Sequence, residues 1–149
     1  MRVAASWEPG ADLPAQTFRV RRADLVAYAG ASGDHNPIHW SDRVATAAGL
    51  PGVVAHGMLT MALGARALST WAGDPGRVRD YAVRFTRPVV VPDDDTGIEV
   101  DVRGTVGTVD AGSAHVDLTV HCGGVPVLGQ ARAVLVAPSR PDGADGADG

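Results

Sequence analysis

The chain has 149 residues, of which 45% are hydrophobic and 20% are charged, and this length and composition fit one globular domain with a single core. Its 13 basic residues are all arginine, which excludes Schiff-base and other lysine-dependent chemistry. The net charge of −4 comes with no basic run, which argues against a nucleic-acid partner, and the single cysteine excludes an internal disulfide.

Short elements are predicted in the first third of the chain. A strand-like run over residues 16–22 leads into a helix that begins near Ala23 and ends by Gly33. A turn-rich segment follows over residues 33–39. Ser41 then caps a short helix, which the glycine and proline of residues 49–51 terminate.

Residues 55–71 are predicted to form a helix enclosed by other structure, because apolar side chains cover nearly every face of it. The surrounding stretch, residues 53–72, contains His56 and Arg66 and is too polar for a membrane span. Residues 1–7 lack the apolar region of a secretory signal. We therefore expect no membrane segment and a cytoplasmic protein.

Four strands are predicted after this helix, because apolar residues alternate with polar ones or form short apolar runs. They are residues 81–86, 98–103, 115–120 and 125–136. Glycine and aspartate at residues 92–95, 110–112 and 123–124 predict hairpins between them. The expected fold is α+β, an antiparallel sheet whose apolar face is covered by the central helix.

The last segment, residues 138–149, repeats glycine, alanine and aspartate and holds no aliphatic side chain larger than alanine. It cannot anchor itself by burial, so we expect one domain over residues 1–137 and a disordered tail after it.

The clearest chemical pattern is the run Asp34-His35-Asn36-Pro37-Ile38-His39. Pro37 fixes one backbone angle and forces Asn36 to be extended, so the turn could bring Asp34 and His39 into one small volume. An acid and a histidine held together can share the two proton transfers that add or remove water across a C=C bond. Alternatively, Asp34 caps the turn and His39 packs in the core; spacing alone does not decide.

A second pattern is Ala55-His56-Gly57-Met58 at the start of the central helix. The first turn of a helix has unpaired N–H groups, and Gly57 allows a ligand to approach the backbone, so a carbonyl oxygen could be polarised there. The alternative is a plain helix start, with the glycine present for packing.

The remaining polar residues indicate less. His115 and His121 fall on the polar face of a predicted strand, and Cys122 falls on the apolar side as a buried thiol. Their spacing does not suggest a metal site, so none is expected. Arg84 and Arg87 could face a phosphate-bearing ligand, with surface charge as the alternative.

The run from Tyr28 to His39, with Ala45 after it, resembles the hydratase 2 signature of the MaoC-like (R)-specific enoyl-thioester hydratases and dehydratases. Residues 56–59 are similar to the second conserved block of that family. The resemblance covers residues 10–137 and implies a hot-dog fold, a long central helix wrapped by an antiparallel sheet. Residues 56–61, and residues 71–76 followed by Tyr81 and residues 83–86, are similar to the catalytic B subunit of actinobacterial (3R)-hydroxyacyl-ACP dehydratases.

Site roles follow from this resemblance. It implies that Asp34 and His39 are the catalytic pair and that the Gly57 N–H holds the thioester carbonyl. Asn36 and His56 are expected to support them. Some members have a serine where this chain has Ala65. No metal and no cofactor are implied.

The implied reaction is reversible dehydration of (3R)-hydroxyacyl thioesters, carried by ACP or CoA, to trans-2-enoyl thioesters in type II fatty-acid elongation. One alternative is an (R)-specific enoyl-CoA hydratase of β-oxidation or polyhydroxyalkanoate supply. Another is a non-catalytic acyl-binding or stabilising subunit, which would be expected to lack the pair. We expect a homodimer, or a heterodimer with a related hot-dog subunit.

Overall fold

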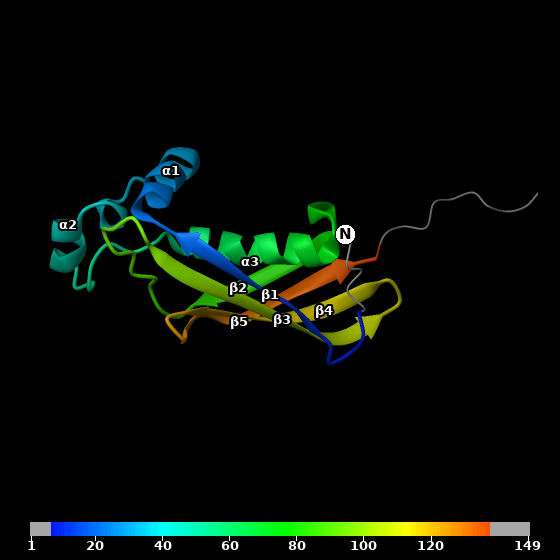
Figure 1. Ribbon diagram of the computed structural model, residues 1–149. Coiled ribbons are helices and arrows are strands. Elements are labelled where there is room, and N and C mark those ends of the chain that lie inside the picture. Colours follow the sequence, from blue (N-terminus) through cyan, green and yellow to red (C-terminus); the bar gives the residue numbers. More distant parts are fainter. Residues whose placement is uncertain (1–6, 138–149) are drawn as a thin grey trace, which may run out of the picture.

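The computed structural model describes residues 7–137; the predicted disordered tail lies outside them. One strand begins the described chain, helical segments follow it, and four consecutive strands end it (Figure 1). In chain order they are β1 (Asp12–Val20), α1 (Arg22–Ser32), the short 3-10 helix η1 (Pro37–His39), α2 (Asp42–Ala47), α3 (Gly57–Ala72), η2 (Pro75–Arg77), β2 (Val78–Phe85), β3 (Ile98–Asp110), β4 (Ser113–Cys122) and β5 (Val125–Val136). No helix among them is long and apolar enough to cross a membrane.

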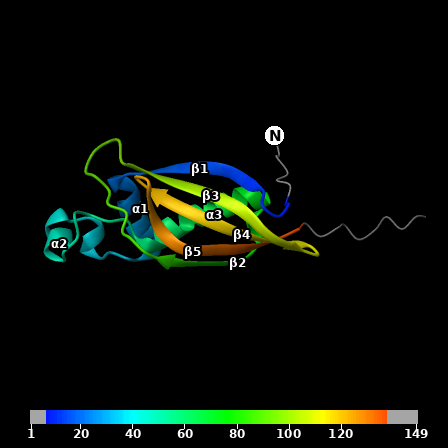
Figure 2. The same ribbon diagram turned by 90° about the horizontal axis from the view of Figure 1, so that it is seen from below.

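The five strands form one antiparallel sheet in the order β1-β3-β4-β5-β2 (Figure 2). The predicted hairpins at residues 110–112 and 123–124 are confirmed, because they join neighbouring strands. The hairpin predicted at residues 92–95 is wrong: β2 pairs with β5 at one edge, whereas β3 lies between β1 and β4. The connection from β2 to β3 instead passes from one edge of the sheet to a strand beyond β5 and β4. Along this connection, residues 89–91 hydrogen-bond to residues 53–55.

The helix α3 lies along one face of the curved sheet, as the α+β hot-dog expectation requires (Figure 1). Its buried positions recur at helical spacing and pack on the inward residues of the strands, which alternate along β3 and β4. From the helix these are Leu63, Ala67, Leu68 and Trp71, and from the two strands Val100, Val102, Val106, Val116, Leu118 and Val120.

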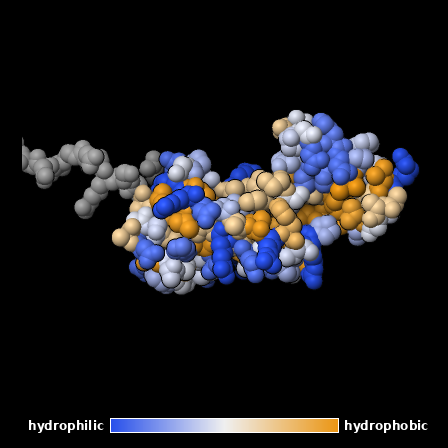
Figure 3. All heavy atoms as spheres, turned by 180° about the vertical axis from the view of Figure 1, so that it is seen from behind, coloured by the Kyte–Doolittle hydropathy of each residue, from blue (hydrophilic) through white to orange (hydrophobic). Residues whose placement is uncertain are grey.

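The expectation that α3 is enclosed on all sides is wrong for the described residues. The sheet covers one side, and the opposite side faces outward, with Met58 57% exposed. Apolar and weakly polar residues are visible over much of the middle of the molecule from behind (Figure 3). A helix that is apolar on nearly every face needs two covering layers, and residues 7–137 supply one.

Two boundaries differ from the prediction for physical reasons. The helix begins at Gly57 rather than Ala55, because residues 53–55 are extended and bonded to residues 89–91. The first strand covers Asp12–Val20, earlier than residues 16–22, and includes an irregularity between Leu13 and Gln16. Irregular pairing of this kind breaks the alternation that a period-two search needs.

One prediction follows from the packing of α3 on β3. An ideal Cβ on Gly104 would lie 2.7 Å from two ring atoms of Trp71, whose indole N–H donates to the Pro14 carbonyl at 2.9 Å and so cannot move freely. We expect Gly104→Ala to lower the free energy of unfolding by about 1–3 kcal/mol, the usual cost of overpacking. Urea unfolding measures it.

Gly107→Ala on the same strand is the matched control. Nothing lies closer than 3.6 Å to the Cβ it would add, so stability should stay within about 0.5 kcal/mol of the wild type. Equal effects of the two changes would contradict this account of the packing.

Candidate active site

The segment between α1 and η1 is a turn held by its own side chains. The helix α1 ends at Gly33, whose φ of 75° is left-handed. An Asp34 carboxylate oxygen, Oδ1, accepts from the Asn36 N–H at 3.1 Å, and the Asn36 side chain accepts from the Ile38 N–H at 3.2 Å. Asn36 is extended, with ψ 123°, as the following proline predicts. The turn therefore fixes how Asp34 and His39 face each other.

The turn brings the two predicted site residues together. Asp34 Oδ2 lies 3.7 Å from His39 Nε2, with the histidine 7% exposed and the aspartate side chain 52% exposed. This is too long for a direct hydrogen bond, but one hydroxyl or water oxygen at about 2.8 Å from each atom can bridge it. The capping and packing described by the first alternative are present, because one carboxylate oxygen of Asp34 bonds within the turn and His39 is buried. The other carboxylate oxygen faces the buried ring, and a catalytic role for the pair stays a prediction.

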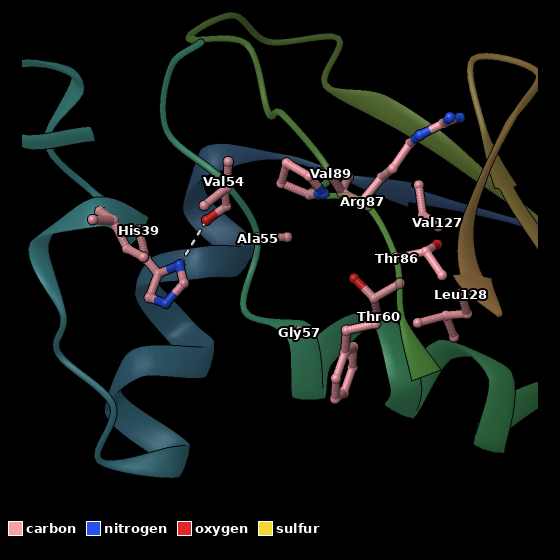
Figure 4. A pocket seen from close by; sticks show the side chains of 13 residues that line it. His39, Val54, Ala55, Gly57, Thr60, Thr86, Arg87, Val89, Val127 and Leu128 are labelled. Atoms are coloured by element: carbon pink, nitrogen blue, oxygen red, sulfur yellow. Dashed lines mark hydrogen bonds between the residues drawn. The ribbon is translucent and has the colours of Figure 1, made fainter. Parts of the chain in front are cut away.

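A backbone carbonyl fixes the protonation pattern of His39. Its Nδ1 lies 2.7 Å from the Val54 carbonyl oxygen (Figure 4). Because a carbonyl can only accept, Nδ1 carries the hydrogen, and in the neutral ring the lone pair is on Nε2. The free lone pair therefore belongs to the nitrogen on the Asp34 side.

The segment that carries the Val54 carbonyl is itself held on both sides. The Val54 N–H donates to the Ile38 carbonyl at 3.2 Å. Asp42 Oδ1 accepts from the Val53 N–H at 3.1 Å and from the Arg22 guanidinium at 2.9 Å. The Arg22 hydrogen bond and then the Val53 N–H lower the pKa of the Asp42 carboxyl. This network links α1 and α2 to the position of His39.

His56 supports the pair from the buried side. It is 2% exposed, and its ring stacks on that of His39 with centroids 3.7 Å apart and planes at 21°. Its Nε2 donates to the Asp34 carbonyl at 3.1 Å, so one side chain contacts both members of the pair. The resemblance placed His56 in a supporting position; the stacking of two rings so far apart in sequence had no signal in the spacing.

Asp34, His39 and His56 offer ligand atoms within 4.8 Å of one another, so a metal ion has to be considered. The two imidazole planes are nearly parallel and stacked, and their in-plane lone pairs therefore run side by side. A zinc centre needs lone pairs that converge on one point about 2.0–2.1 Å from each nitrogen. The ring geometry does not fit three ligands on one ion.

Gly57 meets the site from the start of α3. Its N–H has no acceptor within residues 7–137, as expected for the first turn of a helix. A Cβ at this position would lie 3.2 Å from the Phe85 ring, so glycine keeps the approach to the amide narrow but open. A carbonyl oxygen placed there would meet a free donor at the positive end of the helix dipole.

A mostly apolar cavity of about 340 Å³ opens beside His39 and Gly57 (Figure 4). Its other lining residues are Ile38, Val54, Ala55, Thr60, Phe85, Thr86, Arg87, Pro88, Val89, Val127 and Leu128. Arg87 is exposed at its rim, and its guanidinium extends away from the other lining side chains. The cavity suits an aliphatic group whose reacting end lies at His39.

The other residues singled out in the sequence lie apart from this site. His115 is exposed and His121 is half-buried on β4. Cys122 was expected to be buried but is half-buried, because β4 ends there and the glycine turn follows. Burial, and then the nearby Asp101 carboxylate, raises the pKa of the Cys122 thiol.

A family profile described as a MaoC like domain matches residues 5–121 of the chain. Among curated proteins, the 3-hydroxyacyl-thioester dehydratase X of Mycobacterium tuberculosis is 44% identical over 79 residues, which are 53% of this chain and 27% of that protein. The fatty acid synthase subunit beta of Saccharomyces cerevisiae is 43% identical over 65 residues, which are 42% of this chain and 3% of that protein.

Solved structures agree on the fold. A MaoC-like dehydratase superposes with a TM-score of 0.84 at 41% identity, covering 88% of this chain and 41% of that one. The (R)-hydratase from A. caviae involved in PHA biosynthesis gives a TM-score of 0.77 at 25% identity, covering 91% of this chain and 100% of that one. The matched part of the chain spans about a quarter of the length of the Mycobacterium tuberculosis dehydratase. The closer likeness to a catalytic B subunit stays a prediction.

The Asp42 network predicts a pH-dependent effect. Asp42→Asn should lower the free energy of unfolding at neutral pH, because the Arg22 guanidinium and the Val53 N–H lose their charged acceptor, and the one amide oxygen that remains accepts more weakly. The pKa of Asp42 is lowered from 3.8, so its contribution is complete above that value and disappears as the pH falls through the folded-state pKa. Urea unfolding curves from pH 7 downward should converge for the two proteins.

Asp95→Asn removes an exposed carboxylate that has no hydrogen bond or ion pair in the described structure, and serves as the control. A stability gap for Asp42→Asn that persists unchanged well below pH 3.8 would show that the carboxylate charge is not its origin.

Proposed function

The chain belongs to the family of MaoC-like domains, and on this premise we propose that it interconverts (3R)-hydroxyacyl thioesters with trans-2-enoyl thioesters and water. The observation that carries the proposal is the pair His39 Nε2 and Asp34 Oδ2, 3.7 Å apart beside an apolar cavity. Relatives named as a 3-hydroxyacyl-thioester dehydratase and an (R)-hydratase support it.

The proposed reaction uses the pair as its acid and base. In the dehydration direction the C2–H bond breaks and its electrons form the C=C bond, while the C3–O bond breaks and the hydroxyl leaves as water. One group of the pair takes the C2 proton and the other gives a proton to the leaving oxygen, so their total protonation is unchanged. The space between Nε2 and Oδ2 fits that one oxygen.

The Gly57 N–H is proposed to stabilise the negative charge that develops on the substrate. As the C2 proton leaves, negative charge builds on the thioester oxygen. A free backbone N–H at the start of α3 stabilises it, since the helix dipole points the same way and the donor needs no rearrangement. The role resembles that of an oxyanion hole.

Two settings remain for this chemistry. We favour the type II fatty-acid elongation that the resemblance implies, with an ACP or CoA carrier. Matched relatives that are fatty acid synthase subunits support fatty-acid synthesis as the setting. The match to the whole length of an (R)-hydratase involved in PHA biosynthesis favours the alternative of an (R)-specific enoyl-CoA hydratase. Asp34 and His39 are both in place, so a purely acyl-binding subunit is the weaker alternative.

We predict that the protein works as a dimer, with itself or with a related hot-dog subunit. The outer side of α3 and the edge strand β2 are uncovered, with Met58 57% and Phe85 55% exposed. Light scattering on the purified chain should give about twice 15.3 kDa, or aggregation that co-expression with a partner relieves. A stable, active monomer would contradict this prediction.

We predict that Asp34→Asn and His39→Ala each lower turnover of crotonyl-CoA by roughly 10²- to 10⁴-fold. The melting temperature should change little in Asp34→Asn, because the amide oxygen can still accept from the Asn36 N–H, and it should fall in His39→Ala, because the Val54 carbonyl loses its donor and the His56 ring loses its stacking partner. The double variant should be barely worse than the worse single one, because both groups serve one relay. The hydration rate of crotonyl-CoA and the melting temperature of the three variants measure these effects.

His35→Ala is the matched control, because this exposed neighbour lies in the same turn and its side chain has no hydrogen bond or ion pair within residues 7–137. Single variants of Asp34 and His39 that are destabilised but fully active would favour the capping and packing interpretation and move the chemistry elsewhere.

A further inference from the structure

Thr60 contributes a buried hydroxyl to the cavity beside His39. The residue is 5% exposed and lines the cavity from the fourth position of α3, three residues after Gly57. Figure 4 shows its hydroxyl oxygen pointing into the space that the apolar lining encloses. Thr86 and Arg87 also line this space but are exposed. Among the described lining residues, His39 and Thr60 are therefore the buried polar side chains.

The Thr60 hydroxyl differs from the other hydroxyls on α2 and α3. Each of the others donates to the backbone carbonyl four residues earlier on its own helix: Thr46 to Asp42, Ser69 to Ala65 and Thr70 to Arg66. In Thr60 it is the backbone N–H that donates to the His56 carbonyl, at 3.2 Å, and the hydroxyl has no hydrogen bond within residues 7–137. A hydroxyl that is buried, unpartnered and turned into a cavity is available to a bound ligand.

The unpartnered hydroxyl lies on the same side of α3 as the Gly57 N–H. Residues three apart in a helix share a face, and each side chain leans toward the helix N-terminus, so Thr60 reaches back over the turn that Gly57 begins. Both residues line the same cavity. Two donors without an acceptor in the described part of the chain therefore open on one region of it.

A thioester oxygen matches this pair of donors. A carbonyl oxygen has two lone pairs, and the Gly57 N–H can serve only one of them. The hydroxyl of a (3R)-hydroxyacyl group has its own place, between His39 Nε2 and Asp34 Oδ2. The rest of the acyl chain is apolar, and a sulfur bonded to two carbons is a weak acceptor. The thioester oxygen is thus the acceptor in the acyl group that remains for Thr60.

We propose that the Thr60 hydroxyl donates to the thioester oxygen alongside the Gly57 N–H, so that the first turn of α3 supplies two donors to one oxygen. The proposal rests on the proposed function. In dehydration, negative charge builds on this oxygen as the C2 proton leaves and is lost again when the C3–O bond breaks. Thr60 keeps its proton throughout and contributes only a hydrogen bond, which strengthens as the charge develops.

The carbonyl stretch of a bound, unreactive thioester tests the proposal without relying on turnover. In isotope-edited infrared spectra of bound butyryl-CoA labelled with ¹³C at the carbonyl, the stretch should move to higher frequency in Thr60→Val, because a lost donor leaves a stronger C=O bond. Thr60→Ser, which keeps the hydroxyl, should return it toward the wild-type value. Butyryl-CoA should bind roughly three- to tenfold more weakly to Thr60→Val, whereas S-butyl-CoA, the thioether without the carbonyl, should bind equally well.

Turnover should show the same dependence more strongly. Thr60→Val should lower kcat for crotonyl-CoA by roughly 10²-fold with a smaller rise in KM, since the charge on the oxygen is largest in the transition state. Thr60→Ser should stay close to the wild type. The melting temperature of Thr60→Val should not fall, because the hydroxyl that it removes has no partner within residues 7–137. If the valine variant does not fold, Thr60→Ala supplies the same measurements.

Thr70→Val is the matched control, because it makes the same change on the same helix at an exposed hydroxyl that donates to the Arg66 carbonyl at 3.0 Å. It should alter neither the carbonyl stretch nor kcat. An unchanged stretch in both Thr60→Val and Thr60→Ala would overturn the proposal. Equal losses of affinity for butyryl-CoA and S-butyl-CoA would also overturn it, since they would place the hydroxyl on another part of the ligand.

The infrared and turnover measurements separate this proposal from the proposed function. If the carbonyl stretch depends on Thr60 while the wild type hydrates no enoyl-CoA, the role of Thr60 in binding stands and the lyase proposal fails. If the wild type hydrates crotonyl-CoA and the stretch does not depend on Thr60, the reverse holds.

Discussion

The hydrogen bond from His39 Nδ1–H to the Val54 carbonyl is the constraint on which the rest of the site depends. It assigns the free lone pair to Nε2, and it orients that nitrogen toward Asp34 at 3.7 Å. The carbonyl is in place because residues 53–55 pair with residues 89–91 and because Asp42 holds the Val53 N–H. The connection between β2 and β3 thus helps to hold the candidate site: a tight hairpin at residues 92–95 would have left Val54 without this support.

The composition of this site shows what spacing can and cannot predict. Asp34, His39 and Gly57 were predicted because a rigid turn and a helix start are local features of the sequence. Spacing did not predict the Val54 carbonyl or the His56 ring, because each contacts the turn from 15 or 22 residues away and a backbone carbonyl has no sequence signature. The supporting position of His56 was implied by the family resemblance alone. From spacing, capping of the turn and a catalytic role were alternatives for Asp34. In the structure they do not exclude each other, because Oδ1 accepts from the Asn36 N–H while Oδ2 faces His39.

The fold, too, has features that local sequence patterns predict and features that they do not. Alternation predicted the strands, and turn composition predicted the two hairpins that join neighbours. Turn residues report local backbone preference and say nothing about which strand becomes the partner, so the crossover after β2 was missed. The apolar pattern of α3 likewise predicts that most of its surface is buried, but it does not identify the elements that bury it. Tyr81 on β2 approaches Gly64 on α3 so closely that an added Cβ would lie 2.2 Å from its hydroxyl, and this contact depends on the position of β2 against α3, which no local pattern contains.

Imidazole ¹⁵N NMR of the intact protein tests the central claim most directly, with the His39 signals assigned by their loss in His39→Ala. In a sample alkaline enough for neutral imidazoles, the account predicts a protonated Nδ1 and an unprotonated Nε2 for His39. The opposite tautomer would leave the Val54 carbonyl without its donor and would put a hydrogen in place of the lone pair that this hydrogen bond assigns to Nε2. That result would contradict the proposed acid–base pair.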